Sequence, residues 1–322
     1  MSGPFGAGAL NLFSGVRKFY AHELDQSLRF NDNDTAMLSR TFPSAGNRRT
    51  WTWSGWIKRG NLGNTHPLFV AGSSGSSVLQ FALQTSGSAD RLALYNYTGS
   101  YNLNLATTQF FRDTAGWYNI VLKMDTTQAT SSNRVKIYVN GQQVTSFSTS
   151  SYPSQNFETL VNSAASHRIG RNFDTAVSTK SLDGYVAEVN FVDAPIFTGA
   201  TTSGSATVTG ISSTASLKVG MAVSSSTSSV IAAGTTIASI DSSSQITLSA
   251  NATATNGSAP LTFSATVDFF GETKEGIWVP KQYNGPYGTN GFHLTFEDDT
   301  TVEGFNTVLF DGTGATKSIS GV

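Results

Sequence analysis

The 322-residue sequence contains no cysteine, which excludes a disulfide-stapled scaffold and thiolate chemistry. Only 13% of its residues are charged and the formal net charge is −1 at pH 7. Because neutralising phosphates requires a surplus of basic residues, we expect no nucleic-acid partner. No apolar run approaches the ~20 residues of a membrane-spanning helix, so we expect no membrane insertion. The first residues also lack the basic and apolar regions of a secretory signal, which indicates synthesis in the cytoplasm.

Helix-type periodicity is nearly absent as well, and short alternating runs take its place. Runs such as TWTWSGWIK, VLQFALQ, RLALYNY and RVKIYVNG have strand length and are separated by Gly, Asn, Asp or Ser clusters. The pair Asn140-Gly141 supplies two positive-φ residues for a type I′ turn between alternating strands, which predicts a hairpin. About a dozen strands without helices predict an all-β sandwich or barrel.

The composition changes after Pro195. Residues 196–266 are dominated by Ser, Thr, Ala and Gly, yet runs such as ATVTGI and QITLSA keep β-type alternation. A small inserted β module is therefore favoured over a flexible Ser/Thr linker, which remains the alternative. We predict an arm over 1–25, a sandwich over 26–195 plus 267–300, the insert over 196–266, and the start of a further segment or a linker over 301–322.

The predicted arm is too apolar for a free tail, so we expect it to pack on its own sandwich, on a neighbouring subunit or on a docking partner. The residues expected to anchor it are Phe5, Leu12, Phe13, Phe19 and Tyr20.

Three of the five tryptophans lie within RTWTWSGWIKRG. Side chains alternate between the two faces of an extended strand, so Trp51 and Trp53 share a face with Ile57 while Trp56 shares the other with Lys58. The apolar set predicts core positions for Trp51 and Trp53. Only Trp56 remains a candidate for a surface role.

Six motifs in order resemble the laminin-G-like branch of the concanavalin A-like lectin/glucanase superfamily. They are SLRFNDNDTAMLSRTF, WTWSGWIKRG, GWYNIVLKMD, RVKIYVNGQQV, HRIGRNFD and LDGYVAEVNFVDA. The resemblance implies a concanavalin A-like jelly-roll β-sandwich, into which residues 196–266 would be a small inserted β domain. The residue patterns alone imply only a β-sandwich with that insert.

The opening MSGPFGAGAL and the segment FGETKEGIWVPKQYNGPYGTNGFHLTFED resemble virion proteins of tailed bacteriophages, especially fibre or appendage proteins of marine phages. That resemblance implies a non-catalytic structural protein of the virion, made in the bacterial host cytoplasm and attached through its arm and jelly roll. Expected partners are other virion proteins, further copies of the chain in a homotrimer, and a host surface glycan. The alternatives are a carbohydrate-binding receptor-recognition module and a head decoration or head fibre protein.

Catalysis is not expected. Retaining glycosidases of the superfamily need carboxylates on one face of a strand, in an E-x-D-x-E pattern, and no such triplet occurs here. Glu23-Leu24-Asp25 has only two acids, and Glu188 is followed two positions later by Asn190. A polysaccharide depolymerase is kept as the third hypothesis, after the virion protein and the glycan-binding module.

No cofactor is expected, with calcium left open. Asp32 and Asp34 in NDND offer the hard oxygen ligands that Ca²⁺ prefers, but the later Gly and bidentate Glu of an EF-hand loop are missing. A polar turn is the simpler interpretation.

A carbohydrate site needs exposed aromatic rings beside polar groups, because sugars present C–H faces and hydroxyls. RLALYNYTGSYN offers Tyr95, Tyr97 and Tyr101, and alternation places Arg91 on the face of Tyr95 and Tyr97. Trp56 is added as a further candidate. The alternative interpretation is that these residues are ordinary solvent-facing side chains of a strand and bind no ligand.

Overall fold

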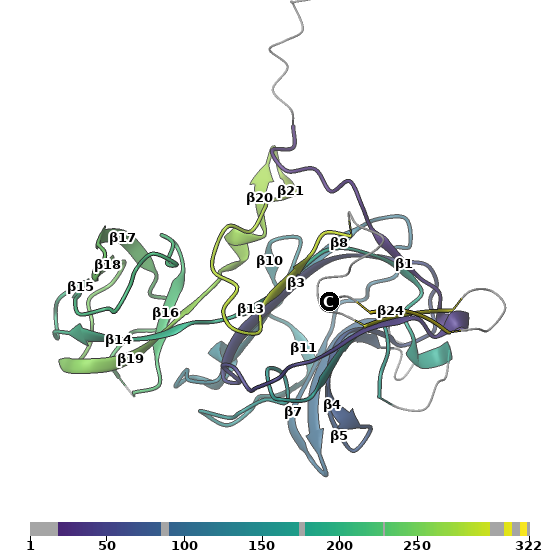
Figure 1. Ribbon diagram of the computed structural model, residues 1–322, viewed down its shortest axis with the longest axis horizontal. Helices are drawn as coiled ribbons and strands as arrows, with labels where there is room; N and C mark the ends of the chain where they lie inside the picture. The colour runs from purple at the N-terminus through teal and green to yellow at the C-terminus, as the bar shows by residue number, and fades with distance from the viewer. Residues whose placement is uncertain are drawn as a thin grey trace, which may run out of the picture.

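The computed structural model describes residues 19–84, 90–173, 178–227, 229–296, 306–310 and 316–320. Two large antiparallel sheets pack face to face, and a smaller module projects from one side (Figure 1). The all-β sandwich with small additional sheets that the sequence predicts is thereby confirmed. The helices of the described ranges are single 3-10 turns, η2 (Asp32–Asp34), η3 (Ser131–Asn133), η4 (Ser178–Lys180) and η5 (Val267–Phe269), and none is long and apolar enough to cross a membrane.

The first sheet has seven strands in the described part of the chain, in the order β1-β13-β3-β8-β9-β10, with β22 also paired to β13. Their bounds are β1 (Leu28–Phe30), β13 (Gly184–Asp193), β3 (Thr50–Arg59), β8 (Tyr118–Asp125), β9 (Val135–Val139), β10 (Gln142–Gln143) and β22 (Phe292–Leu294).

The second sheet has nine strands among the described residues, in the order β11-β7-β6-β5-β4-β12-β2-β23-β24. Their bounds are β11 (Phe147–Ser151), β7 (Tyr101–Thr107), β6 (Arg91–Thr98), β5 (Ser77–Gln84), β4 (His66–Ser74), β12 (Ser166–Ile169), β2 (Met37–Thr41), β23 (Asn306–Phe310) and β24 (Thr316–Ser320). The last two strands form a hairpin whose β23 pairs with β2.

The core lies between the two sheets and is rich in aromatic rings. Trp51, Trp53 and Ile57 are fully buried there, which confirms the division of β3 into two faces. The Trp51 indole also donates to Thr159 Oγ1 at 3.0 Å, so its one polar atom is paired inside the core. The predicted turn is confirmed too, since Asn140 and Gly141 have φ of 47° and 76° between β9 and β10.

The segment between β13 and η5 forms a module with its own hydrophobic core (Figure 1). One three-stranded sheet consists of β14 (Ile196–Thr201), β19 (Asn256–Ser264) and β16 (Ala222–Ser225), and the other of β15 (Thr207–Val208), β18 (Gln245–Leu248) and β17 (Ile237–Ser242). Alternating Val, Ile, Leu and Phe residues fill the space between these sheets, which is the packing that a flexible linker would lack.

A further layer covers part of the outer face of the seven-stranded sheet. The chain returns from the module through η5 and the hairpin of β20 (Gly271–Lys274) and β21 (Ile277–Pro280). Phe270 and Tyr283 stack with ring centroids 5.3 Å apart and pack on Val121 and Val192 of the sheet. This layer leaves Trp56 at its margin, beside the N-terminal segment.

Candidate functional site

A trough runs across the outer face of the nine-stranded sheet. It measures about 270 Å³ and lies over β5, β6, β7 and β11. Leu92 and Leu94 point into the core, so Arg91 and Tyr95 point outward into the trough, as the alternation predicts. Tyr101, at the start of β7, joins them from the neighbouring strand.

The floor of the trough consists of small side chains. Ala82 pairs with Ala93, and Ala93 with Ala106, so three alanines lie side by side on adjacent strands. Thr149 of β11 continues this row, because it pairs with Ala106. A methyl group rises little above the sheet, so Ala93 and Ala106 leave room above them in the trough, whereas Ala82 is fully buried.

Aromatic rings form one wall of the trough. Tyr101 is 58% exposed and packs edge-to-face on Tyr95 and Tyr97, with ring centroids 5.8 and 5.0 Å away. The amide of Asn104 and the hydroxyl of Ser148 line the same trough. The rings therefore hold one another in place beside groups that can bind hydroxyls.

The other wall of the trough is formed by the cationic side chain of Arg91, which follows a buried ion pair in sequence. The Arg91 guanidinium lies 4.8 Å from the ring centre of Phe110, whose ring also contacts Arg112 at 4.5 Å. Asp90 directly precedes Arg91 in the sequence, and its Oδ1 lies 2.9 Å from Arg59 Nη1. Burial alone would raise the pKa of Asp90, but the hydrogen bond and charge of Arg59 outweigh it and lower that pKa.

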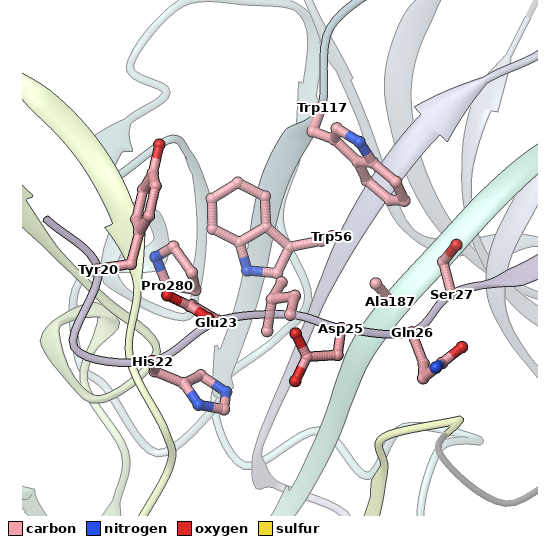
Figure 2. A pocket seen from close by; sticks show the side chains of 11 residues that line it. Tyr20, His22, Glu23, Asp25, Gln26, Ser27, Trp56, Trp117, Ala187 and Pro280 are labelled. Atoms are coloured by element: carbon pink, nitrogen blue, oxygen red, sulfur yellow. The ribbon is translucent and has the colours of Figure 1, made fainter. Parts of the chain in front are cut away.

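A larger cavity of about 520 Å³ lies on the opposite side of the sandwich, over the seven-stranded sheet. Trp56 lines it and is only 9% exposed, and no described residue accepts a hydrogen bond from its indole N–H. Figure 2 shows Tyr20 and Trp117 on either side of Trp56, with the carboxylates of Glu23 and Asp25 on the segment that crosses beside it. The N-terminal segment thus forms one wall of this cavity.

The same segment is attached to the sandwich at a β-bulge. Glu188 is the extra residue of the bulge in β13 and has a φ of 47°, and it is buried. Its Oε1 lies 2.7 Å from His293 Nε2 and 3.5 Å from His22 Nε2. Lys274 adds a hydrogen bond of 2.6 Å to the Phe19 carbonyl. Sequence reasoning missed this cluster, because the histidines show no spacing that joins them.

The two acidic residues considered for calcium serve a hydrogen-bonded turn. Asp32 Oδ2 accepts from the amides of Asn61 and Asn64, each at 2.9 Å, and Asp34 accepts from Asn31 at 2.8 Å. Over the described ranges, no group of three His, Asp or Glu side chains is arranged to hold a metal ion. The polar-turn interpretation accounts for both carboxylates.

The structure divides the predicted carbohydrate residues between two places. Arg91, Tyr95 and Tyr101 meet in the trough with Tyr97 beside them, whereas Trp56 lies on the other sheet. Of the predicted arm anchors, Phe19 and Tyr20 pack on each other with ring centroids 4.9 Å apart. The anchors Phe5, Leu12 and Phe13 lie outside the described residues.

Two stacked antiparallel sheets make the fold a β-sandwich, and each outer face carries an aromatic-lined cleft. Residues 31–200 match the family model of the concanavalin A-like lectin/glucanases superfamily, which is more than half of the chain. The chain therefore belongs to this superfamily, as its six motifs suggested. No curated protein matches the sequence.

Solved structures with a similar arrangement come from distant proteins. A heptameric SAP-like pentraxin from Limulus polyphemus is 15% identical, with a TM-score of 0.37 over 54% of this chain and 78% of its own. Domain 4 of a GH43 extracellular arabinanase from Geobacillus stearothermophilus, in complex with arabinotriose, is 15% identical, with a TM-score of 0.39 over 53% and 71%. Domains LG4-5 of the mouse laminin α1 chain are 11% identical, with a TM-score of 0.38 over 82% and 88%.

Proposed function

We propose that the chain is a non-catalytic carbohydrate-binding protein whose glycan lies in the trough of the nine-stranded sheet. The observation that carries the proposal is the convergence of Arg91, Tyr95 and Tyr101 on one trough with an alanine floor. The rings offer surfaces for the C–H faces of a sugar, and Arg91 and Asn104 offer partners for its hydroxyls.

The lining of the trough also favours binding over hydrolysis. Glycoside hydrolysis requires a pair of carboxyl groups flanking the scissile bond. Among the described residues that line the trough there is no Asp or Glu, and the polar side chains are amides, hydroxyls and one guanidinium. A glycan in this trough would be held without being cleaved.

A glycan array probed with the full chain tests the proposal, followed by calorimetric titration of the best ligand. Tyr101→Ala removes an exposed ring, and we expect at least a tenfold weaker affinity, equivalent to about 1.4 kcal/mol. Trp117→Ala, which removes a partly exposed ring from the other cavity, is the matched control and should leave the affinity unchanged. The reverse result would move the site to the Trp56 cavity, and an array without ligands would contradict glycan binding.

We also propose that the protein is a structural component of a tailed-phage virion, as a tail fibre or other appendage protein. The sequence resemblance supports this role, and so does the attachment of the N-terminal segment from Phe19 onward, through His22 to Glu188 and through the Phe19 carbonyl to Lys274. A receptor-recognition module or a head decoration or head fibre protein remains the alternative.

Immunogold labelling of purified particles distinguishes the locations on the virion. Gold at the tail supports the fibre or appendage, gold on the capsid supports the head protein, and unlabelled particles contradict the virion role. Deleting residues 1–18 should abolish incorporation into particles if this segment is the anchor. Light scattering of the purified chain tests the expected homotrimer, and a monomer would contradict that oligomer while leaving glycan binding in place.

A further inference from the structure

Two lysines of the seven-stranded sheet lie directly opposite each other on adjacent strands. Lys123 of β8 and Lys136 of β9 are cross-strand partners. Both point away from the core, because the residues that flank them in sequence are core residues: Leu122, Met124, Val135 and Ile137. Like charges placed directly opposite destabilise a pair of strands. Within the described part of the chain, neither ammonium group has a hydrogen bond or an ion pair.

The inserted module covers these lysines and encloses a small pocket of about 160 Å³, here called the lysine pocket. It is lined by Lys123, Lys136, Asn133, and the hydroxyl residues Thr236 and Thr266 among others. The pocket therefore lies between the sandwich and the inserted module, where groups of both could hold one ligand.

A wider cleft adjoins the lysine pocket. It measures about 500 Å³, shares Thr236 and Thr266 with the pocket, and adds Lys218 and Lys281. Four of the nine lysines of a sequence poor in charge thus line two adjoining cavities, together with two carboxylates, Asp125 of the pocket and Asp268 of the cleft. This excess of positive charge favours an anionic ligand.

The one carboxylate that lines the lysine pocket does not neutralise the pair. Asp125 accepts hydrogen bonds from Thr50, Thr127 and Gln128, so its oxygens are committed to neighbours in its own turn. Burial, the largest cause, lowers the pKa of Lys123 to about 8; the charge of Asp125 opposes that shift and the charge of Lys136 adds to it. Two cations therefore face one carboxylate.

We propose that the lysine pocket binds one tetrahedral oxyanion, a phosphate or sulfate group, between Lys123 and Lys136. An oxyanion gives both ammonium groups charge-assisted hydrogen bonds and ends the repulsion between them. The pocket is smaller than the trough, at about 160 Å³ against about 270 Å³, and its paired ammonium groups suit a compact anion rather than a sugar ring. The group is therefore either a free ion or an ester on a sugar whose ring extends into the wider cleft. The site is independent of the trough, which lies on the other sheet.

Calorimetric titration and thermal unfolding of the full chain at pH 7 test the proposal. The ligands are potassium phosphate, potassium sulfate, glucose 6-phosphate and galactose 6-sulfate, each compared with potassium chloride at equal ionic strength. An anion that binds the folded state raises Tm by about 5 °C at a hundredfold excess over Kd, which screening by chloride cannot match.

The variant Lys123→Met removes the charge and keeps an unbranched apolar chain. We expect a higher Tm in chloride, because the repulsion is gone, and at least tenfold weaker phosphate binding. Lys58→Met, on β3 of the same sheet, is the matched control and should bind phosphate like the wild type. Lys136→Met carries the same expectations and replaces Lys123→Met if that variant does not fold.

Each outcome decides one point. Equal affinity for the free ions and the sugar esters identifies an ion that joins the module to the sandwich. A tenfold preference for an ester identifies a charged glycan as the source. Equal effects of phosphate and chloride, or unchanged phosphate binding in both lysine variants, would overturn the proposal.

Discussion

The ring of Tyr101 meets the ring of Tyr95 edge-on, with centroids 5.8 Å apart and planes at 88°. Tyr97 packs on the other side of Tyr101 with an interplanar angle of 61°. Edge-to-face pairs of this kind contribute about 0.5–1.5 kcal/mol beyond the burial of their surface. Tyr101 is thus exposed and yet braced by two neighbours, so a ligand that stacks on it need not first order a mobile side chain.

Filling the floor of the trough should block ligand binding without removing any of its aromatic rings. Ala93 lines the trough next to Ala106, so the ring of Ala93→Phe would occupy the space above Ala106. We expect at least tenfold weaker glycan binding by calorimetric titration and a Tm close to that of the wild type. Gln143→Phe adds the same ring to the exposed end of the other sheet and should bind normally. Normal binding by Ala93→Phe would place the glycan elsewhere.

Local alternation explains how much of the trough and the core the sequence could predict. It separates Trp53 from Trp56 and places Arg91 with Tyr95, because neighbouring side chains on a strand point to opposite faces. It says nothing of which distant strands become neighbours. Alternation therefore could not predict that Ser148 of β11 lines the trough.

The cluster around Glu188 was even harder to predict from local alternation. Its partner His293 is 105 residues away in sequence, and the bulge that turns Glu188 outward breaks the regular alternation. The residue patterns predicted the β-sandwich and the faces of single strands, and the family resemblance predicted the jelly-roll form of the sandwich. The clefts depend on pairing between strands and on the path of the N-terminal segment, which only the structure shows.

Removing the N-terminal segment should expose Trp56. The segment forms one wall of the cavity around this residue, and His22 and the Phe19 carbonyl attach it to the sandwich. In a chain that lacks residues 1–25, we expect stronger quenching of tryptophan fluorescence by acrylamide. Trp56→Phe in the shortened chain should cancel most of the increase. Quenching that does not change on shortening would show that other residues shield Trp56.

His167 should make the protein less stable in acid. Its ring is fully buried, accepts a hydrogen bond from the Asn162 N–H at 2.9 Å, and lies 2.9 Å from the Ala165 carbonyl. Burial lowers its pKa to about 4, while the Ala165 hydrogen bond opposes that shift. The unfolded state therefore binds more protons between pH 6.5 and 4, so its contribution to stability is present above pH 6.5 and is lost as the pH falls.

Urea unfolding at pH 7 and pH 4.5 measures this effect of His167. We expect it to account for about 2 kcal/mol of the stability lost between these two pH values. His167→Asn keeps a side-chain N–H but does not titrate, so it should be less stable at pH 7 and lose less stability on acidification. The same pH dependence in wild type and variant would assign the acid effect to other groups, such as the buried His66.

The buried pair of Arg59 and Asp90 should be costly to break. The Arg59 side chain is fully buried, and its Nη1 also donates to the Phe111 carbonyl at 2.6 Å. Asp90→Ala leaves the guanidinium without its counter-charge, so we expect a loss of about 3–5 kcal/mol in urea unfolding. Asp113→Ala removes an exposed carboxylate from the following loop and should cost far less. A comparable loss of stability in the two variants would show that the buried pair contributes no more than an exposed carboxylate.

Raising the pH should stabilise the protein through Lys123, provided that no phosphate or sulfate is present. Its pKa is about 8 in the folded protein against 10.5 for an ordinary lysine, and burial is the main cause. Between these values the unfolded state holds a proton that the folded state has released, so the free energy of unfolding rises with pH. Because solvent reaches part of the side chain, the expected gain between pH 7.5 and pH 9.5 is about 1–2 kcal/mol. Lys123→Met should already be more stable at pH 7.5 and lack this gain, whereas Lys58→Met should retain it. Parallel pH profiles for the wild type and Lys123→Met would show that Lys123 is not desolvated beneath the inserted module.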